Sequence, residues 1–304
     1  MSGCDLLVTG AHGFVARHLL ERAGHAGLDV RRTNGDLRDA AVADAEVAAA
    51  RPRAVVHLAA SARGGEPRAA LAADLAMATS MLRAVARHVP DAPLLVAGSA
   101  AQYGNGAARP LVEEDPTVPL SAYGSLKCVL ERALLATPLQ LGVRVIFTRS
   151  FNHIGPGQGA DAPAGQWARQ IASAEVAGGG TIRTGELGAV RDFLDVRDVC
   201  DAYLALVLST ARGVVNVCSG VPVSVGMVVE ALVGHSSVAV TVWRDPALVR
   251  DADPPYVVGS PALLHALTGW TPQISLERSV SDLLEACRSE RGLARAADLP
   301  AVAS

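Results

Sequence analysis

The stretch DLLVTGAHGFVARHLL, residues 5–20, decides the fold. A short apolar run leads into three small residues, Gly10, Gly13 and Ala16, and then into a helical pattern. A glycine at the first position permits a tight turn, and one at the second lets a pyrophosphate approach the helix N-terminus. Alanine at the third position is small enough for the helix to pack on the strand. A motif of this kind directly after a first strand predicts a dinucleotide-binding unit.

Short apolar runs alternate with helical stretches through the first half of the chain. Strands separated by helices need crossover connections, which favour parallel pairing. The sequence therefore predicts an α/β fold with a Rossmann-type doubly wound parallel sheet. The predicted strands are 5–10, 28–30, 53–60, 93–100 and 142–150, and the first helices cover about 12–23 and the segment with Leu71, Leu75, Leu82 and Val85.

The pattern changes after Ser150, where a segment rich in glycine and proline is followed by short, interleaved strands and helices. We therefore predict a smaller C-terminal α/β lobe that binds substrate. The predicted division is 1–150 for the nucleotide-binding domain, with 190–215 returning to it, 151–189 and 216–290 for the substrate lobe, and 291–304 for a tail.

Composition excludes several classes of function. The net charge is −3 and the arginines are scattered, so we expect no nucleic-acid partner. The five cysteines include no CxxC pair and predict free thiols in a reducing cytoplasm. We expect no signal peptide, because the N-terminus enters an apolar strand at once, and no membrane association, because no apolar run spans a bilayer. The eight histidines form no HExxH motif, so we expect no metal site.

The end of the second strand bears on the choice of cofactor. NAD sites usually place an acidic residue there, whereas an arginine accommodates the 2′-phosphate of NADP. Arg31 and Arg32 at this tip favour NADP(H), with NAD(H) as the alternative because Asp29 lies within the strand. The competing interpretation is that Arg31 and Arg32 are ordinary solvent-exposed arginines at a strand end. His57 is expected to be a core histidine. The predicted cofactor-binding residues are Gly10, His12, Gly13, Phe14, Val15, Arg31, Arg32, Asp36, Leu37, Leu58, Ala59, Ala60, Tyr123 and Lys127.

Lys127 is the only lysine in the chain and follows Tyr123 by four residues. With Ser121 as helix N-cap, this spacing places both side chains on one helical face. A nearby ammonium favours a tyrosinate, which makes a tyrosine usable as a general acid at neutral pH. The planar fork of an arginine would not replace the compact ammonium. Ser99, at the end of the fourth strand, could bind a substrate carbonyl.

The glycine-rich turn, Ser99, Tyr123 and Lys127 occur in an order and spacing that closely resemble the extended short-chain dehydrogenase/reductase superfamily. The resemblance covers nearly the whole chain. It implies that Ser99 and Tyr123 contact the reacting oxygen, and that Lys127 assists the tyrosine and binds the nicotinamide ribose. One departure is Asp74, which aligns with a position where this superfamily usually carries asparagine.

The second half resembles the nucleotide-sugar branch of this superfamily, closest to the GDP-4-keto-6-deoxy-D-mannose reductase group. The segments RSFNHIGPGQ (149–158) and GELGAVRDFLDVRDVCDAY (185–203) carry this resemblance. It implies that Asn152 and Arg191 hold the diphosphate, and that Arg250 and Asp253 hold phosphate and ribose. Trp167 is either a base-stacking residue or a packed core residue. The full predicted substrate-binding set is Ser61, Ser99, Ala100, Asn152, His153, Trp167, Leu187, Arg191, Arg250 and Asp253.

The residues after Ser99 separate the reactions of this branch. Related 4,6-dehydratases carry acidic residues there, whereas this chain has Ala100 and Ala101, which supply neither acid nor base. We therefore predict an NADPH-dependent reductase of a GDP- or dTDP-linked 4-keto-6-deoxyhexose. The alternatives are an NDP-sugar 4-epimerase with bound NAD and a non-catalytic nucleotide sensor. We also expect a homodimer through the helices near 71–89 and 121–136.

Overall fold

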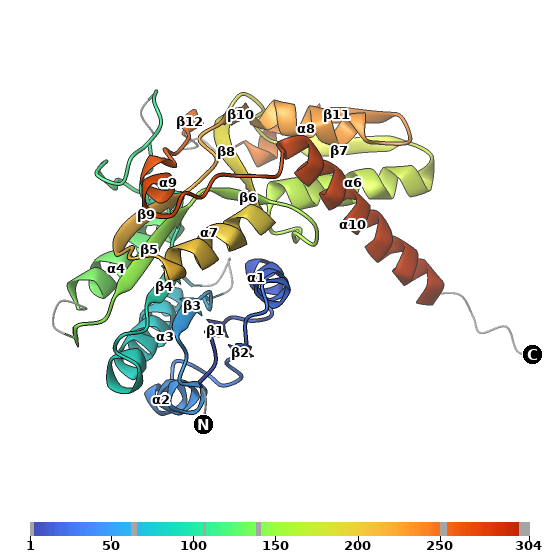
Figure 1. Ribbon diagram of the computed structural model, residues 1–304. Helices are drawn as coiled ribbons and strands as arrows, with labels where there is room; N and C mark the ends of the chain where they lie inside the picture. The colour runs from blue at the N-terminus through green and yellow to red at the C-terminus, as the bar shows by residue number, and fades with distance from the viewer. Residues whose placement is uncertain (1–2, 62–65, 106–107, 138–140, 250–253, 298–304) are drawn as a thin grey trace, which may run out of the picture.

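The computed structural model describes residues 3–61, 66–105, 108–137, 141–249 and 254–297, the last five of these by their backbone alone. Its larger sheet has six parallel strands in the order β2-β1-β3-β4-β5-β9 (Figure 1). This confirms the predicted Rossmann-type doubly wound sheet. The strands are β1 (Leu6–Thr9), β2 (Val30–Arg32), β3 (Ala54–His57), β4 (Leu94–Ala97), β5 (Val145–Ser150) and β9 (Gly213–Val217).

The second strand lies later than predicted. The expected strand at 28–30 ends where β2 begins, because Val30 pairs with Leu6 and Arg32 pairs with Val8 in the parallel register with β1. Arg31 and Arg32 therefore belong to the strand itself, and their side chains alternate between its two faces. This alternation separates their roles, as described below.

Helices cover both faces of the larger sheet. The helices α1 (Phe14–His25) and α7 (Val196–Leu208) pack on one face, and α2 (Ala40–Ala50), α3 (Pro67–His88) and α4 (Ala122–Ala136) cover the other. Helix α2 was not predicted from the sequence, because its run of alanines shows almost no apolar periodicity. Asp39 caps α2 by accepting a hydrogen bond from the Ala41 N–H.

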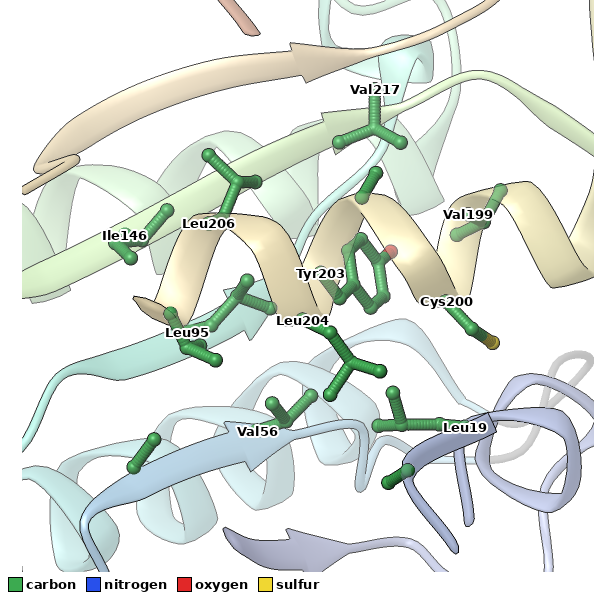
Figure 2. Close-up of a cluster of buried hydrophobic side chains, with 14 of the residues drawn as sticks. Leu19, Val56, Leu95, Ile146, Val199, Cys200, Tyr203, Leu204, Leu206 and Val217 are labelled. Atoms are coloured by element: carbon green, nitrogen blue, oxygen red, sulfur yellow. The ribbon is translucent and has the colours of Figure 1, made fainter. Parts of the chain in front are cut away.

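The core between α7 and the sheet joins residues that are distant in sequence. Figure 2 shows Val199, Tyr203 and Leu206 of α7 facing the strands that carry Val56 and Ile146. All five side chains are fully buried. The segment that returns to the larger sheet thus consists of α7 and β9, and α7 covers one face of that sheet together with α1.

A second, smaller sheet is built around β8 (Val190–Asp195), which pairs with β6 (Asn152–Ile154), β10 (Pro222–Ser224) and β12 (Tyr256–Val257). Beside it, β7 (Gly180–Thr184) pairs with β11 (Val240–Arg244). A separate hydrophobic core lies among α6 (Pro163–Ala177), α8 (Val225–Gly234) and α10 (Leu276–Ala297). The remaining described elements are η1 (Ala100–Gln102), η2 (Pro246–Leu248) and α9 (Ala262–Thr268).

The predicted division into two domains stays a prediction, but the elements show where the chain crosses between the two sheets. It leaves the larger sheet after β5, returns through α7 and β9, and leaves again at β10. β8, at the start of the predicted returning segment, belongs to the smaller sheet. The last helix, α10, continues to residue 297 and so extends into the segment assigned to a tail.

Helix α3 is long and apolar enough to cross a membrane by length and composition alone, a test that core helices of soluble proteins also pass. Its Met81, Leu82 and Val85 are fully buried in the core under the larger sheet. It also carries a buried carboxylate, Asp74, that pairs with α4. These contacts are those of a core helix.

Candidate active site

The turn after β1 has the geometry that dinucleotide binding requires. Gly10 has a φ of 67°, and a Cβ there would lie 2.7 Å from the Ala59 backbone nitrogen, so no other residue fits. Gly13 is the N-cap of α1, and the helix start has neither a side-chain cap nor an acidic residue in its first turn. The first N–H groups of α1 are therefore open to an anion at the point between β1 and β3 where the strand order of the sheet changes direction.

The end of β3 is held in place by Thr9. Its Oγ1 accepts hydrogen bonds from the Leu58 and Ala59 N–H groups, both at 3.1 Å, and lies 2.9 Å from His57 Nδ1. Because this hydroxyl already accepts twice, it donates its own proton to Nδ1, and the His57 proton resides on Nε2. His57 is thus a satisfied core histidine, as predicted.

The imidazole of His57 is kept neutral. Burial lowers the pKa of His57 to about 4, the positive charge of Lys127 acts in the same direction, and Asp74 opposes both. A positive charge here would also turn Nδ1 into a donor facing the Thr9 hydroxyl. His57 is therefore an uncharged packing residue beneath the site.

The two arginines of β2 point to different surroundings. Arg31 Nη1 donates to the Ala49 carbonyl at the end of α2, at 3.1 Å. Arg32 is exposed at the last position of the strand, where no hydrogen bond within the described ranges engages its guanidinium. Both line an open hollow of about 470 Å³ beside β2. Arg32 is thus the better placed of the two for a 2′-phosphate.

Two other predicted cofactor contacts lie on the loop after β2. Asp36 forms an ion pair with Arg38, whose hydrogen bonds lower the pKa of the Asp36 carboxyl to about 2. Leu37 is buried in the core beneath α2 and α3. Asp36 is therefore an ionised hydrogen-bond acceptor, as an adenine amino group would require, whereas Leu37 packs inward.

Helix α4 presents Tyr123 and Lys127 on one face. Ser121 is its N-cap, accepting from the Gly124 N–H at 3.0 Å, as predicted. Lys127 Nζ lies 5.8 Å from the centroid of the Tyr123 ring. Tyr123 is 38% exposed whereas Lys127 is 4% exposed, so the phenol faces the open side and the ammonium lies beneath it.

The ammonium of Lys127 has a buried partner that sequence reasoning did not pair with it. Its Nζ lies 3.7 Å from Asp74 Oδ2, and both side chains are 5% exposed. The other Asp74 oxygen accepts from the Ser61 N–H at 2.7 Å. Asp74 therefore ties the loop after β3 to the face of α4 that carries Tyr123 and Lys127 through one carboxylate.

Ser99 lies between β4 and η1, whose N-cap it is. Its Oγ accepts from the Ala101 N–H at 3.2 Å. The neighbouring Gly124 lets α4 come close to this turn, since a Cβ there would lie 2.4 Å from the Ala101 carbonyl oxygen. The turn continues with Ala100, Ala101 and Gln102, none of which brings a titratable group.

The predicted substrate residues are divided by the structure. Asn152 on β6 and Arg191 on β8 lie on neighbouring strands, and Asn152 Nδ2 donates to the Asp192 carbonyl at 3.1 Å. Trp167 is only 6% exposed and packs in the core of the smaller half, so its interpretation as a core residue holds and base stacking is not supported. His153 and Leu187 are half-buried, while Arg250 and Asp253 lie outside the described residues.

The comparison with known sequences decides the family. The sequence pattern of the NAD dependent epimerase/dehydratase family matches residues 6–218. The chain belongs to this family. Within the NAD dependent epimerase/dehydratase family, the GDP-6-deoxy-D-mannose reductase of Pseudomonas aeruginosa is 34% identical over 292 residues, which are 92% of this chain and 95% of the relative.

Solved structures of the same family superpose closely. The structure of RMD from Pseudomonas aeruginosa complexed with NADPH has a TM-score of 0.86 and 31% identity, covering 95% of this chain and 98% of that one. The UDP-glucose 4-epimerase of Thermus thermophilus in complex with NAD has a TM-score of 0.82 and 25% identity, covering 93% and 99%. The resemblance inferred from the sequence motifs is confirmed.

Proposed function

We propose that the protein is an NADPH-dependent 4-ketoreductase that acts on an NDP-4-keto-6-deoxyhexose, with the GDP-linked sugar as first candidate. The observation that carries this proposal is the arrangement of Ser99, Tyr123 and Lys127 beside a turn whose first two residues after Ser99 are alanines. The identity to a GDP-6-deoxy-D-mannose reductase, above that to a UDP-glucose 4-epimerase, supports it.

The residues around β1 and β2 fit the cofactor. Gly10 lets the turn after β1 lie against the end of β3, where a side chain would collide with the backbone, and the α1 N-terminus offers N–H donors to a pyrophosphate. Arg32 would take the 2′-phosphate and Asp36 the adenine amino group. Lys127 would hold the nicotinamide ribose, close to Tyr123. Bound NADPH supplies the hydride for the ketone carbon.

The chain's own groups complete the reduction. Ser99 has its Oγ occupied as an acceptor by the Ala101 N–H, so its remaining O–H proton is available to the ketone oxygen. Tyr123 would hydrogen-bond the same oxygen and give it a proton, and this proton together with the hydride at the carbon converts the ketone to an alcohol. Asn152 and Arg191, on the neighbouring strands β6 and β8, would bind the diphosphate and use remote binding energy to orient the sugar.

The rival reactions need features that the site supports less well. A 4,6-dehydratase needs an acid and a base after Ser99, where Ala100 and Ala101 lie. A 4-epimerase needs tightly held NAD, and Arg32 favours the 2′-phosphate of NADP instead. A non-catalytic sensor has no need for the Tyr123–Lys127 pair.

The test is NADPH absorbance with a panel of GDP- and dTDP-linked 4-keto-6-deoxy sugars, with products identified by NMR. We expect NADPH oxidation with at least one of these ketones. The sugar nucleotide with the fastest turnover identifies the preferred nucleotide base, guanine or thymine. In parallel, mass spectrometry follows GDP-mannose and dTDP-glucose, which should not lose water. Water loss from either sugar, or no NADPH oxidation with any 4-keto substrate, would overturn the assignment.

We also propose that the enzyme works in the cytoplasm as a homodimer built on α3 and α4. These helices pack side by side, and α4 exposes Val129, which is 43% accessible. In such a dimer the partner helix would bury this apolar side chain. Light scattering of the purified protein should give twice the monomer mass, and V129E should shift it toward the monomer.

A further inference from the structure

The backbone around Ser99 is held by a side chain that the proposed mechanism does not use. The Ser99 N–H donates to Gln102 Oε1 at 3.3 Å, while Ser99 Oγ accepts from within the same turn, and together these form a capping box. Gln102 is fully buried. The conformation of Ser99 thus depends on where the Gln102 amide is placed.

The far end of the Gln102 amide is anchored by charge. Its Nε2 donates to Glu131 Oε2 at 2.7 Å. Because a carboxylate can only accept, the nitrogen must face Glu131 and the oxygen must face the Ser99 N–H. The orientation of the amide is therefore not free, and a reversed amide would leave Ser99 without its acceptor.

Glu131 is in turn fixed by Arg149 of β5. Arg149 donates to both carboxylate oxygens, at 2.9 and 2.7 Å, and the two side chains are 6% and 9% exposed. The same guanidinium donates to the Glu113 carbonyl and lies 4.7 Å from the centroid of the Tyr103 ring. A bidentate ion pair at this depth holds its geometry tightly.

This series of buried hydrogen bonds is connected through α4 to the other proposed catalytic residues. Glu131 follows Lys127 by four residues and Tyr123 by eight, so all three lie on one face of the helix. At one end of this series Glu131 belongs to the helix that carries Tyr123 and Lys127, and at the other end Gln102 holds Ser99.

We infer that Gln102 and Glu131 are positioning residues, which fix the Ser99 hydroxyl relative to Tyr123 so that both donate to one ketone oxygen. The inference rests on the proposed reductase function. Its physical basis is that a donor aimed at developing charge works only when it is already in place, and that a misplacement of about 1 Å can cost about 100-fold in rate.

A double-mutant cycle separates this role from mere stabilisation. Gln102→Leu removes both hydrogen bonds at similar volume, and Ser99→Ala removes the hydroxyl that Gln102 is inferred to place. We expect Q102L to lower kcat at least about 10-fold with little change in KM, and S99A to lower it about 100-fold. The double variant should be no slower than S99A, because Gln102 then has nothing left to position.

Two further variants support the cycle. Thr184→Val removes a buried hydroxyl in the smaller half, where Thr184 is fully buried, and controls for loss of stability without a change in kcat. If Q102L does not fold, Gln102→Met, which is more flexible at similar volume, replaces it. Additive effects of the two substitutions, or a Q102L kcat equal to that of the wild type, would overturn the inference.

A second measurement does not depend on turnover. The Ser99 amide should exchange its hydrogen at least about 10-fold faster in Q102L, because its acceptor is lost. Should the wild type reduce no ketone, the proposed function fails, and this measurement still tests whether Gln102 holds Ser99. An unchanged exchange rate contradicts the inference even in an active enzyme.

Discussion

Mild acid should destabilise this protein because His57 is buried as the neutral imidazole. The folded state resists protonation, with a His57 pKa of about 4 caused first by burial and then by Lys127. The unfolded chain takes up this proton near the ordinary histidine pKa of about 6.5. Stability that is complete above that pH is therefore lost as the pH falls toward 4.

The size of the loss follows from the two pKa values. The pKa of His57 is about 6.5 in the unfolded chain and about 4 in the folded protein. This difference lowers the free energy of unfolding by about 2 kcal/mol between pH 7 and pH 5, and by about 3 kcal/mol by pH 4. His57→Asn is the informative variant, because its amide reproduces the contact of Nδ1 with the Thr9 hydroxyl but does not titrate.

The measurement is urea unfolding followed by circular dichroism at pH 7, 6 and 5, for the wild type and H57N. The free energy of unfolding of the wild type, relative to that of H57N, should fall by about 2 kcal/mol from pH 7 to pH 5. The exposed His265 on α9 provides a control variant, H265N. Parallel pH profiles for the wild type and H57N would refute the assignment of a neutral, buried imidazole.

Three further outcomes test the site. Tyr123→Phe should retain NADPH binding, measured by fluorescence titration, and lose about 10²–10⁴-fold in turnover, so near-normal rates would remove Tyr123 from the mechanism. Arg32→Ala should weaken the preference for NADPH over NADH by about 10-fold or more in kcat/KM, whereas Arg31→Ala should change it less, and the reverse order would contradict the placement of the 2′-phosphate. Gly98 directly precedes Ser99, and Gly98→Ala should impair folding or kcat, because the added Cβ would lie 2.4 Å from the Thr148 carbonyl oxygen of β5. A fully active, equally stable variant would show that this turn is not rigid.

The parts of the fold that could be predicted are those encoded by local pattern. Gly10 and Gly13 after an apolar run identify the first unit of the sheet, and Ser121 identifies the start of α4. The alanine-rich helix α2 was missed, because alanine favours a helix without marking a buried face.

The supporting contacts of the site could not be predicted in the same way. Asp74 and Lys127 are 53 residues apart, and only the packing of α3 on α4 makes them partners. Gln102, Glu131 and Arg149 likewise come from three different elements, and each alone resembles an ordinary polar residue. The one local signal that could have indicated such a network is that Glu131 follows Lys127 by four residues in a helix that also carries the apolar residues Leu130 and Leu134.

The late return of α7 and β9 affects how the chain can fold during synthesis. Leu6, Val56 and Ile146 are made early, but the α7 side chains that cover them are synthesised only after residue 195. Until then, α1 covers only part of this face, and the apolar part that α7 covers is exposed and prone to association. A fragment that ends at residue 150 would keep that part permanently exposed, and we expect it to aggregate rather than act as an isolated nucleotide-binding module. The order in which these elements leave the ribosome therefore makes the two halves dependent on each other for solubility as well as for catalysis.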